Sequence, residues 1–274
     1  MTRQQKIWKG AAAVLYSVRP LLLYLFLPGI LMSLGMMIRR YSGSDAAFIL
    51  ESGNFYNFVS MLLVLAYFGR ASKKRGQEFW DEVTLYIKKP DRKEAEFWLV
   101  CLLFGASVGL FLSALLSLLP DWLLASYSER SAGIFSGRDL ILVALTVGFL
   151  APLTEEIVFR GYMLNRLMTF FSVRHSVILC AAFFAVCHVN VFWMIYALAM
   201  GFFLCWISLK KDNILYSVLV HVGFNLPSVM IAVLQSAGSA GQWFFGSRFL
   251  IFLYGVIGAA SGRLLYRKIR MGEE

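Results

Sequence analysis

The sequence predicts an all-α membrane protein, a bundle of about eight transmembrane helices with both the N- and the C-terminus in the cytoplasm. Three observations lead to this fold class. The composition is too apolar for a water-soluble domain. The apolar residues gather in eight segments. The basic residues fall almost entirely in alternate connections between those segments.

The composition requires lipid as the solvent for much of the protein surface. Of the 274 residues, 59% are hydrophobic and 15% are charged, whereas a soluble domain has about 45–50% apolar and about 25% charged residues. The mean hydropathy is +0.68. The 24 Phe, 12 Tyr and 7 Trp residues cannot all lie in one soluble core of this length. The excess apolar surface is therefore expected to face hydrocarbon.

The apolar segments belong to one predicted polytopic domain, residues 1–274, because no Pro-, Gly- or Ser-rich linker divides the chain. Residues 161–174 are amphipathic, and we expect them to lie at the membrane interface or to re-enter the membrane. Loop 70–96 alternates aromatic and charged residues, which fits an interfacial amphipathic helix and a solvated connector equally well. The expected spans are 19–38, 55–69, 97–118, 139–159, 175–190, 192–209, 214–235 and 247–265.

The positions of the basic residues predict the orientation of the bundle in the membrane. They also indicate that the net charge of +10 serves contact with lipid and not with nucleic acid. With the N-terminus in the cytoplasm, 20 of the 26 Lys and Arg residues fall on the cytoplasmic side and five on the opposite side. Arg19 lies at the edge of the first segment. This asymmetry is the positive-inside pattern of membrane proteins. Anionic lipid headgroups are the expected counter-charges, and no nucleic acid is expected.

Two adjacent carboxylates, Glu155 and Glu156, end the apolar run that begins at Leu140. A carboxylate in a membrane helix costs about 2.5–3.5 kcal/mol on insertion scales, so a pair indicates either a function or a helix end that reaches the interface. Neighbouring helical residues point in different directions, so the two carboxylates cannot both lie on one face of the helix. Glu156 precedes Arg160 by four residues, the favourable direction for an ion pair. We therefore expect Glu156 to pair with Arg160 and Glu155 to stay uncommitted.

Two of the three histidines lie inside membrane segments. His175 follows a basic residue at the start of a segment and is expected at the interface, whereas His188 lies late in that segment and His221 near the middle of the seventh. A lone histidine in an apolar helix is more often a packing residue than a catalyst. Two histidines, together with Asn225 on the same helix face as His221 and the uncommitted Glu155, favour a functional site.

Irregular backbone is expected beside both groups of polar residues. Pro152 should bend its helix and loosen the backbone hydrogen bonds. Pro227 removes the hydrogen bond to the carbonyl of Gly223, which predicts a local kink. Gly223 itself leaves room for the close approach of a helix or a ligand. Such backbone is tolerated at membrane depth where it lines a protein cavity.

These side chains suit attack of water on a peptide carbonyl without a metal. Glu155 could act as a general base while His188 holds and polarises the water, and His221 and Asn225 could donate hydrogen bonds to the oxyanion. No serine or cysteine lies beside a base at a recognisable spacing. A catalytic zinc held by Glu155, His188 and His221 is the alternative. Zinc would consume the base and one of the donors, and no H-E-x-x-H helix is present, so no cofactor or metal is expected.

Three motifs follow one another along the chain: E-E-x-x-x-R at 155–160, F-x-x-x-H at 184–188 and H-x-x-x-N at 221–225. Their order and spacing resemble those of the CAAX-protease and bacteriocin-processing family, the intramembrane proteases that include Ras-converting enzyme. The resemblance covers about residues 135–235, which form the expected catalytic core. The first 130 residues carry no comparable signature.

The resemblance implies an eight-helix bundle whose conical cavity opens to the cytoplasm and to lipid, with the activity of a glutamic intramembrane endopeptidase. It implies that Glu155 and His188 activate water, and that His221 and Asn225 form the oxyanion hole. Arg160 would order the site. The implied substrate is a peptide or protein presented from the membrane or from the cytoplasmic side.

Two other classes of function fit parts of the pattern. A non-proteolytic immunity or scaffold protein could keep the cavity as a binding site. A transporter could use Glu155 and the histidines as a proton relay. Transporters have paired halves with broken helices, whereas the unusual polar residues here all lie in the C-terminal half. The endopeptidase is therefore preferred. The compact chain and its short loops favour the membrane of a prokaryotic cell.

Overall fold

The computed structural model describes residues 3–42, 53–74, 76, 78–87, 89–135, 140–236 and 248–271. These residues form helices joined by short connections, and no strand occurs among them, which confirms the all-α prediction. Six of the described helices are long and apolar enough to cross a membrane: Trp8–Ile38, Arg92–Leu116, Leu140–Met168, Val191–Lys211, Leu215–Val233 and Phe249–Arg270. The protein is an integral, multi-pass membrane protein.

The two remaining expected segments also form helices. Segment 55–69 lies inside α3 (Gly53–Lys74). Segment 175–190 corresponds to α10 (Val173–Val186), which has 14 residues and is shorter than the roughly 20 that a perpendicular span requires. The side of the membrane on which each terminus lies stays a prediction.

The described helices gather in two compact units, and each unit combines separated parts of the sequence. The boundary falls inside α8 (Ala151–Glu156). The first unit, Met1–Tyr86 with Thr154–Ile214, holds α1 (Arg3–Ser42), α3, α4 (Phe79–Glu82), η2 (Ile157–Leu164), α9 (Asn165–Met168), α10 and α11 (Val191–Lys211). The second unit, Ile87–Leu153 with Leu215–Glu274, holds α5 (Arg92–Leu116), α6 (Asp121–Phe135), α7 (Leu140–Val143), η1 (Ala144–Leu150), α12 (Leu215–Ser236) and α14 (Arg248–Met271).

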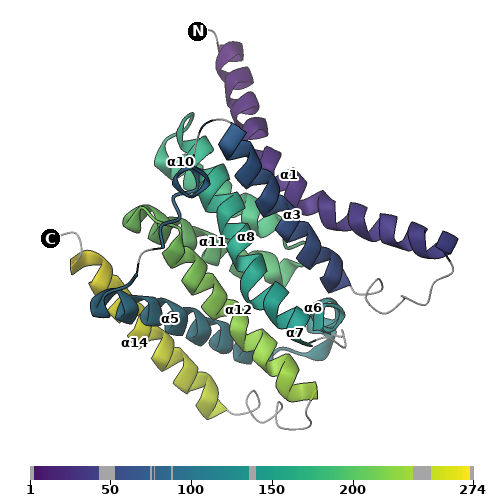
Figure 1. Cartoon of the computed structure of the whole chain (residues 1–274). Coiled ribbons are helices and arrows are strands. Elements are labelled where there is room, and N and C mark those ends of the chain that lie inside the picture. Colours follow the sequence, from purple (N-terminus) through teal and green to yellow (C-terminus); the bar gives the residue numbers. More distant parts are fainter. Residues whose placement is uncertain are drawn as a thin grey trace. The chain divides into compact units, whose positions relative to one another are not determined.

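In the first unit, α1 packs against α3, η2 and α9. Figure 1 shows that α1 changes direction along its length, as expected of a helix that contains Pro20 and Pro28. Helices α10 and α11 pack closely. A Cβ atom added at Gly201 would lie only 3.1 Å from the Cβ atom of Ala181. The backbone of α11 at Gly201 also meets a buried arginine, which is described below.

Two of the expected connections differ from the sequence prediction. Residues 161–168 continue the preceding helix as the end of η2 and as α9, and Gly161 to Leu164 are buried, so the expected interfacial position of 161–174 is wrong for this part. In loop 70–96, residues 70–74 are the end of α3, α4 is a single turn and α5 begins at Arg92, so the described residues of this loop form no separate long interfacial helix. Val83 and Leu85 are instead buried, and Val83 packs against the bare backbone of Gly161.

In the second unit, α5 packs against both α12 and α14. Glycines make the contact between α5 and α12 unusually close. A Cβ atom at Gly105 would collide with the carbonyl oxygen of Val220, and one at Gly223 would collide with the carbonyl of Leu102. The predicted role of Gly223 in close helix approach is therefore confirmed. Helix α12 is continuous through Pro227.

The helix that carries the first motif is not a regular α-helix. Two π-helical stretches, η1 and η2, flank α8. The N–H group of Ala151 donates to the carbonyl of Thr146, five residues earlier, instead of to that of Val147. Pro152 has no N–H group to give to the Val147 carbonyl. The predicted loosening of backbone hydrogen bonds at Pro152 is confirmed, and it leaves a carbonyl that requires another donor.

Candidate active site

The second carboxylate of the first motif is committed to an arginine. The Arg160 Nη1 atom donates to Glu156 Oε1 at 2.9 Å, and neither side chain has any solvent exposure. Arg160 Nη2 also donates to the carbonyl of Gly201 at 3.1 Å, where the close packing of α10 and α11 brings that backbone near. The predicted Glu156–Arg160 ion pair is confirmed, and it fixes η2 to α11 through a buried charge.

The phenylalanine of the second motif connects the arginine to the histidine. The Arg160 guanidinium carbon lies 4.5 Å from the centre of the Phe184 ring, in cation–π geometry. The Phe184 ring also contacts the ring of His188, whose centre is 4.9 Å away at an interplanar angle of 67°. Phe159 packs edge-on against the same ring at 5.0 Å. The first two motifs therefore form one contiguous cluster of side chains in the first unit.

His188 lies just beyond α10, in the turn that leads to α11. Its Nδ1 atom is 2.7 Å from the carbonyl oxygen of Phe184. Because a carbonyl can only accept, Nδ1 carries the hydrogen, and in the neutral ring Nε2 is the acceptor. The next residue, Val189, has a φ of 60°, a strained value for a β-branched residue. Asn190 then caps α11 by accepting from the N–H groups of Phe192 and Trp193.

Glu155 has surroundings different from those of Glu156. Its side chain is half-buried, whereas Glu156 is fully buried. The Tyr24 hydroxyl donates to Glu155 Oε1 at 2.7 Å. Glu155 also lies near enough to Cys187, the residue before His188, to interact with it electrostatically. The two neighbouring carboxylates thus point to different surroundings, as the helical geometry predicted. The expectation that Glu155 stays uncommitted is wrong, because its Oε1 atom accepts the hydrogen bond from Tyr24.

Sequence reasoning missed Tyr24. It lies in the expected apolar segment 19–38, where a tyrosine ordinarily marks an interface or packs in the bundle. It is separated from Glu155 by 131 positions. No spacing rule connects residues so distant, and the first 130 residues contain no recognisable motif. The only available signal was a hydroxyl group inside an apolar run.

The third motif lies on α12 in the second unit. His221 is buried, with 5% of its surface exposed, and Asn225 is half-buried one turn later. The Asn225 Nδ2 atom donates to the Val147 carbonyl at 3.0 Å. This is the carbonyl that Pro152 leaves without a backbone donor. The side-chain amide has two N–H groups, so this bond orients Asn225 and leaves one further donor on the same nitrogen.

The structure therefore describes the predicted site residues in two groups. Glu155, Glu156, Arg160 and His188 lie in the first unit, and His221 and Asn225 lie in the second, each described within its own unit. The third histidine, His175, is exposed at the start of α10 and contacts the capping Ser172 at 2.7 Å. Within the described ranges, no group of three or more His, Cys, Asp or Glu side chains is arranged to hold a metal ion.

Comparison with known proteins agrees with the three motifs. Residues 137–227, which include all three, match the family model described as Type II CAAX prenyl endopeptidase Rce1-like. The chain is also 25% identical over 132 residues to the UPF0177 protein YxdF of Lactococcus lactis subsp. lactis (strain IL1403), covering 47% of this chain and 73% of that protein. No solved structure gives a significant match. The family resemblance predicted from the motifs is confirmed, and the bacterial relative agrees with a prokaryotic origin.

Proposed function

We propose that this protein is an intramembrane endopeptidase that hydrolyses a peptide bond of a membrane-associated peptide or protein. The premise is that residues 137–227 match a family of CAAX prenyl endopeptidases and that several of the chain's helices are long and apolar enough to cross a membrane. Membrane lipid surrounds the enzyme, and the substrate reaches it from the membrane or from its cytoplasmic side.

The observation that supports this proposal most strongly is that two adjacent carboxylates, Glu155 and Glu156, have different surroundings. Glu156 is fully buried and paired with Arg160, so it serves the fold. Glu155 is half-buried, accepts a hydrogen bond from a tyrosine hydroxyl and is within electrostatic range of Cys187, in the turn that carries His188. A carboxylate that accepts a hydrogen bond from a neutral hydroxyl group on one oxygen can offer its other oxygen to a water molecule as a general base.

In the proposed reaction Glu155 and His188 act together on one water molecule. Glu155 removes a proton from the water while the Nε2 atom of His188 accepts the other hydrogen bond and aligns it. The hydroxide attacks the peptide carbonyl, whose π electrons move to oxygen. When the tetrahedral intermediate collapses, Glu155 returns its proton to the leaving amine, so the carboxylate is regenerated.

The oxyanion is assigned to the residues of the third motif. His221 and the second N–H group of Asn225 donate hydrogen bonds to the developing negative charge. The bond from Asn225 to the Val147 carbonyl holds the amide in one orientation before the substrate arrives. Removing one such donor in other enzymes lowers kcat by about 100- to 1,000-fold, and we expect the same order here.

The proposed reaction uses no metal or other cofactor. A zinc ion would take Glu155, His188 and His221 as ligands, and neither the general base nor one of the oxyanion donors would then be left for its role. Elemental analysis of the purified protein decides between the two versions. Cleavage that persists after dialysis against a chelator, in protein without stoichiometric zinc, supports the metal-free reaction. Loss of cleavage with restoration by zinc overturns it.

The proposal is tested with the full chain in lipid nanodiscs and a fluorogenic peptide, offered with and without a farnesylated C-a-a-X tail. Wild type is compared with Glu155→Gln and with Glu129→Gln, a matched control in which an exposed carboxylate on α6 is changed. We expect wild type and the control to cleave at the same rate. Glu155→Gln should lower kcat by about 100- to 10,000-fold, because general-base catalysis contributes about that much.

Cleavage that survives Glu155→Gln overturns the proposed mechanism. If neither peptide nor a wider set of membrane peptides is cleaved, and an immunity phenotype in cells is unchanged by Glu155→Gln, the non-proteolytic scaffold replaces the endopeptidase. The prenylated and unprenylated peptides also report separately on the substrate class. A strong preference for the farnesylated peptide assigns the CAAX type of substrate.

A further inference from the structure

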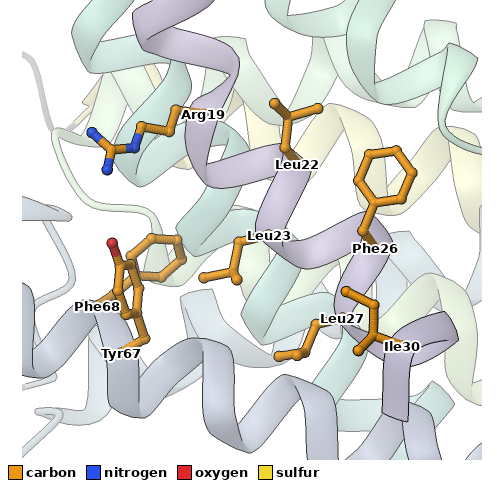
Figure 2. A pocket seen from close by; sticks show the side chains of 8 residues that line it. All are labelled: Arg19, Leu22, Leu23, Phe26, Leu27, Ile30, Tyr67 and Phe68. Atoms are coloured by element: carbon orange, nitrogen blue, oxygen red, sulfur yellow. The ribbon is translucent and has the colours of Figure 1, made fainter. Parts of the chain in front are cut away.

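An apolar groove runs along one face of α1 in the first unit, next to α3. It has a volume of about 370 Å³ and is lined from α1 by Arg19, Leu22, Leu23, Phe26, Leu27 and Ile30 and from α3 by Tyr67 and Phe68. Figure 2 shows the aliphatic side chains following one another along the helix, with Arg19 at one end. The spacing of three and four residues places the α1 members on one helix face.

Arg19 gives this groove a charged end. It is exposed and lies within the span Trp8–Ile38. Among the residues that the structure describes, it has no hydrogen bond, ion pair or ring contact. A guanidinium in a membrane span requires an anion, and the bilayer itself supplies phosphate groups, which the guanidinium binds bidentately. In Figure 2 the Tyr67 hydroxyl points toward the end of the groove where Arg19 lies, as a second donor would.

The length of the groove matches one lipid leaflet. From Arg19 to Ile30 the helix advances by about 16 Å, at 1.5 Å per residue. This is about half of the roughly 30 Å thickness of the hydrocarbon core. An acyl chain that starts at a phosphate bound to Arg19 can therefore follow the groove to the middle of the bilayer.

We propose that this groove is a binding site for an anionic phospholipid, with the phosphate at Arg19 and Tyr67 and one acyl chain along α1. The site is separate from the proposed peptidase reaction and does not depend on it. The formal charge of Arg19 favours an anionic over a zwitterionic headgroup, because the zwitterion carries its own cation beside the phosphate. Bound lipid would cover apolar surface between α1 and α3.

Native mass spectrometry of the full chain tests the lipid site. Purified protein is delipidated and offered equal amounts of phosphatidylglycerol and phosphatidylcholine with the same acyl chains. We expect wild type to retain phosphatidylglycerol at least fivefold more often. Arg19→Gln should abolish this preference, and Leu27→Trp, which fills the groove, should reduce retention of both lipids. Arg267→Gln, which removes an exposed arginine of α14, should behave as wild type.

Equal retention of the two lipids by wild type, or an undiminished preference in Arg19→Gln, overturns the site. If Leu27→Trp retains both lipids as well as wild type does, any bound lipid lies outside the groove, and the proposed site is again overturned. A farnesylated peptide that displaces phosphatidylglycerol completely would assign the groove to substrate instead. Thermal unfolding of each variant identifies any that is misfolded, and Leu23→Phe then replaces Leu27→Trp as the variant that fills the groove.

A different observation carries a second inference, which rests on the proposed function. Tyr24 donates a 2.7 Å hydrogen bond to Glu155 Oε1 from a helix that no motif includes. Tyr24 lies about one turn from Leu21 and about two turns from Ser17, on the buried side of α1, and is itself half-buried. We infer that Tyr24 is a positioning residue for the general base, because one of the two carboxylate oxygens is held in place by this hydroxyl and the plane of the carboxylate is thereby fixed.

Steady-state kinetics of Tyr24→Phe tests this role, with Tyr16→Phe as a matched control on the same helix. Tyr16 uses its ring, not its hydroxyl, to contact Arg166. We expect kcat of Tyr24→Phe to fall 10- to 100-fold with KM within twofold, and no change for Tyr16→Phe. In a Glu155→Gln background the additional effect of Tyr24→Phe should vanish, because the two residues act as a unit.

An infrared readout separates failure of this inference from failure of the proposed function. The carboxylate band of Glu155, assigned by its loss in Glu155→Gln, should shift in Tyr24→Phe and not in Tyr16→Phe. If no peptide is cleaved but the band shifts, the contact holds and the peptidase proposal fails. If wild type cleaves and Tyr24→Phe changes neither kcat nor the band, the inference about Tyr24 is wrong.

Discussion

The two groups of motif residues are held by different kinds of interaction. In the first unit, Glu156, Arg160 and Phe184 form a buried network of charge and aromatic rings around Glu155 and His188. In the second unit, His221 and Asn225 lie on a helix whose position is set by contacts between glycine residues and backbone carbonyls. One group depends on electrostatics in a dry interior, and the other depends on steric fit of the backbone.

This difference predicts which kinds of substitution will destabilise each group. A buried ion pair leaves an uncompensated charge when one partner is removed. A glycine contact fails when any side chain is added, whatever its polarity. Substitutions in the two units should therefore separate in both size and chemical specificity, and four of them test the comparison.

The largest effect is expected from Arg160→Ala. It leaves the Glu156 carboxylate buried without its cation, and the loss of stability should be about 3–5 kcal/mol. Chemical unfolding in mixed detergent micelles measures the free energy. The double variant Glu156→Leu/Arg160→Met should recover much of the loss, since it buries no charge. Equal instability of the single and double variants would show that packing, and not charge, holds this unit together.

A smaller effect is expected from Gly223→Ala, which would drive a methyl group into the carbonyl of Leu102. Overpacking of this kind costs about 1–3 kcal/mol. Gly133→Ala on α6 is the matched control, because its added methyl meets no atom within 4 Å. The control should be neutral or stabilising by up to about 1 kcal/mol. The same unfolding measurement serves both variants, and a neutral Gly223→Ala would refute close packing in the second unit.

The third prediction concerns the hydrogen bond from Asn225 to Val147. Asn225→Ala leaves the Val147 carbonyl without its donor and should lower stability by about 1 kcal/mol. Pro152→Ala supplies a backbone N–H group near the same carbonyl, so the cost of Asn225→Ala should shrink in that background. A double-mutant cycle of unfolding free energies measures this coupling. Strict additivity would mean that the missing N–H group of Pro152 is not what Asn225 replaces.

The smallest change in stability is expected at Val189. Its φ of 60° disfavours a β-branched residue, so Val189→Asn should be neutral or stabilising by about 1 kcal/mol while the turn keeps its shape. Val189→Gly relieves the same strain but loosens the turn beside His188. We expect kcat of Val189→Gly to fall several-fold and kcat of Val189→Asn to stay unchanged. Equal kcat values for the two variants would show that the turn does not position His188.

Much of the fold and part of the site geometry were predictable from local sequence. The span segments follow from hydropathy, which depends on composition over a single window. The Glu156–Arg160 pair follows from the helical repeat, and the packing of Gly223 follows from the absence of a side chain. Residues 161–168 were predicted incorrectly, because their amphipathic pattern suggests an interface while their burial is set by α1, α10 and α11.

By itself, the sequence determined the class of the protein and the identity of its motif residues, because apolar composition, residue type and spacing are local properties. Only the tertiary structure assigned the partners that lie far away along the chain. The contact of Tyr24 with Glu155 joins residues 131 positions apart. Asn225 donates a hydrogen bond to the carbonyl of Val147, which Pro152 leaves without a backbone donor. Such contacts depend on which helices pack together, and packing is a property of the whole chain.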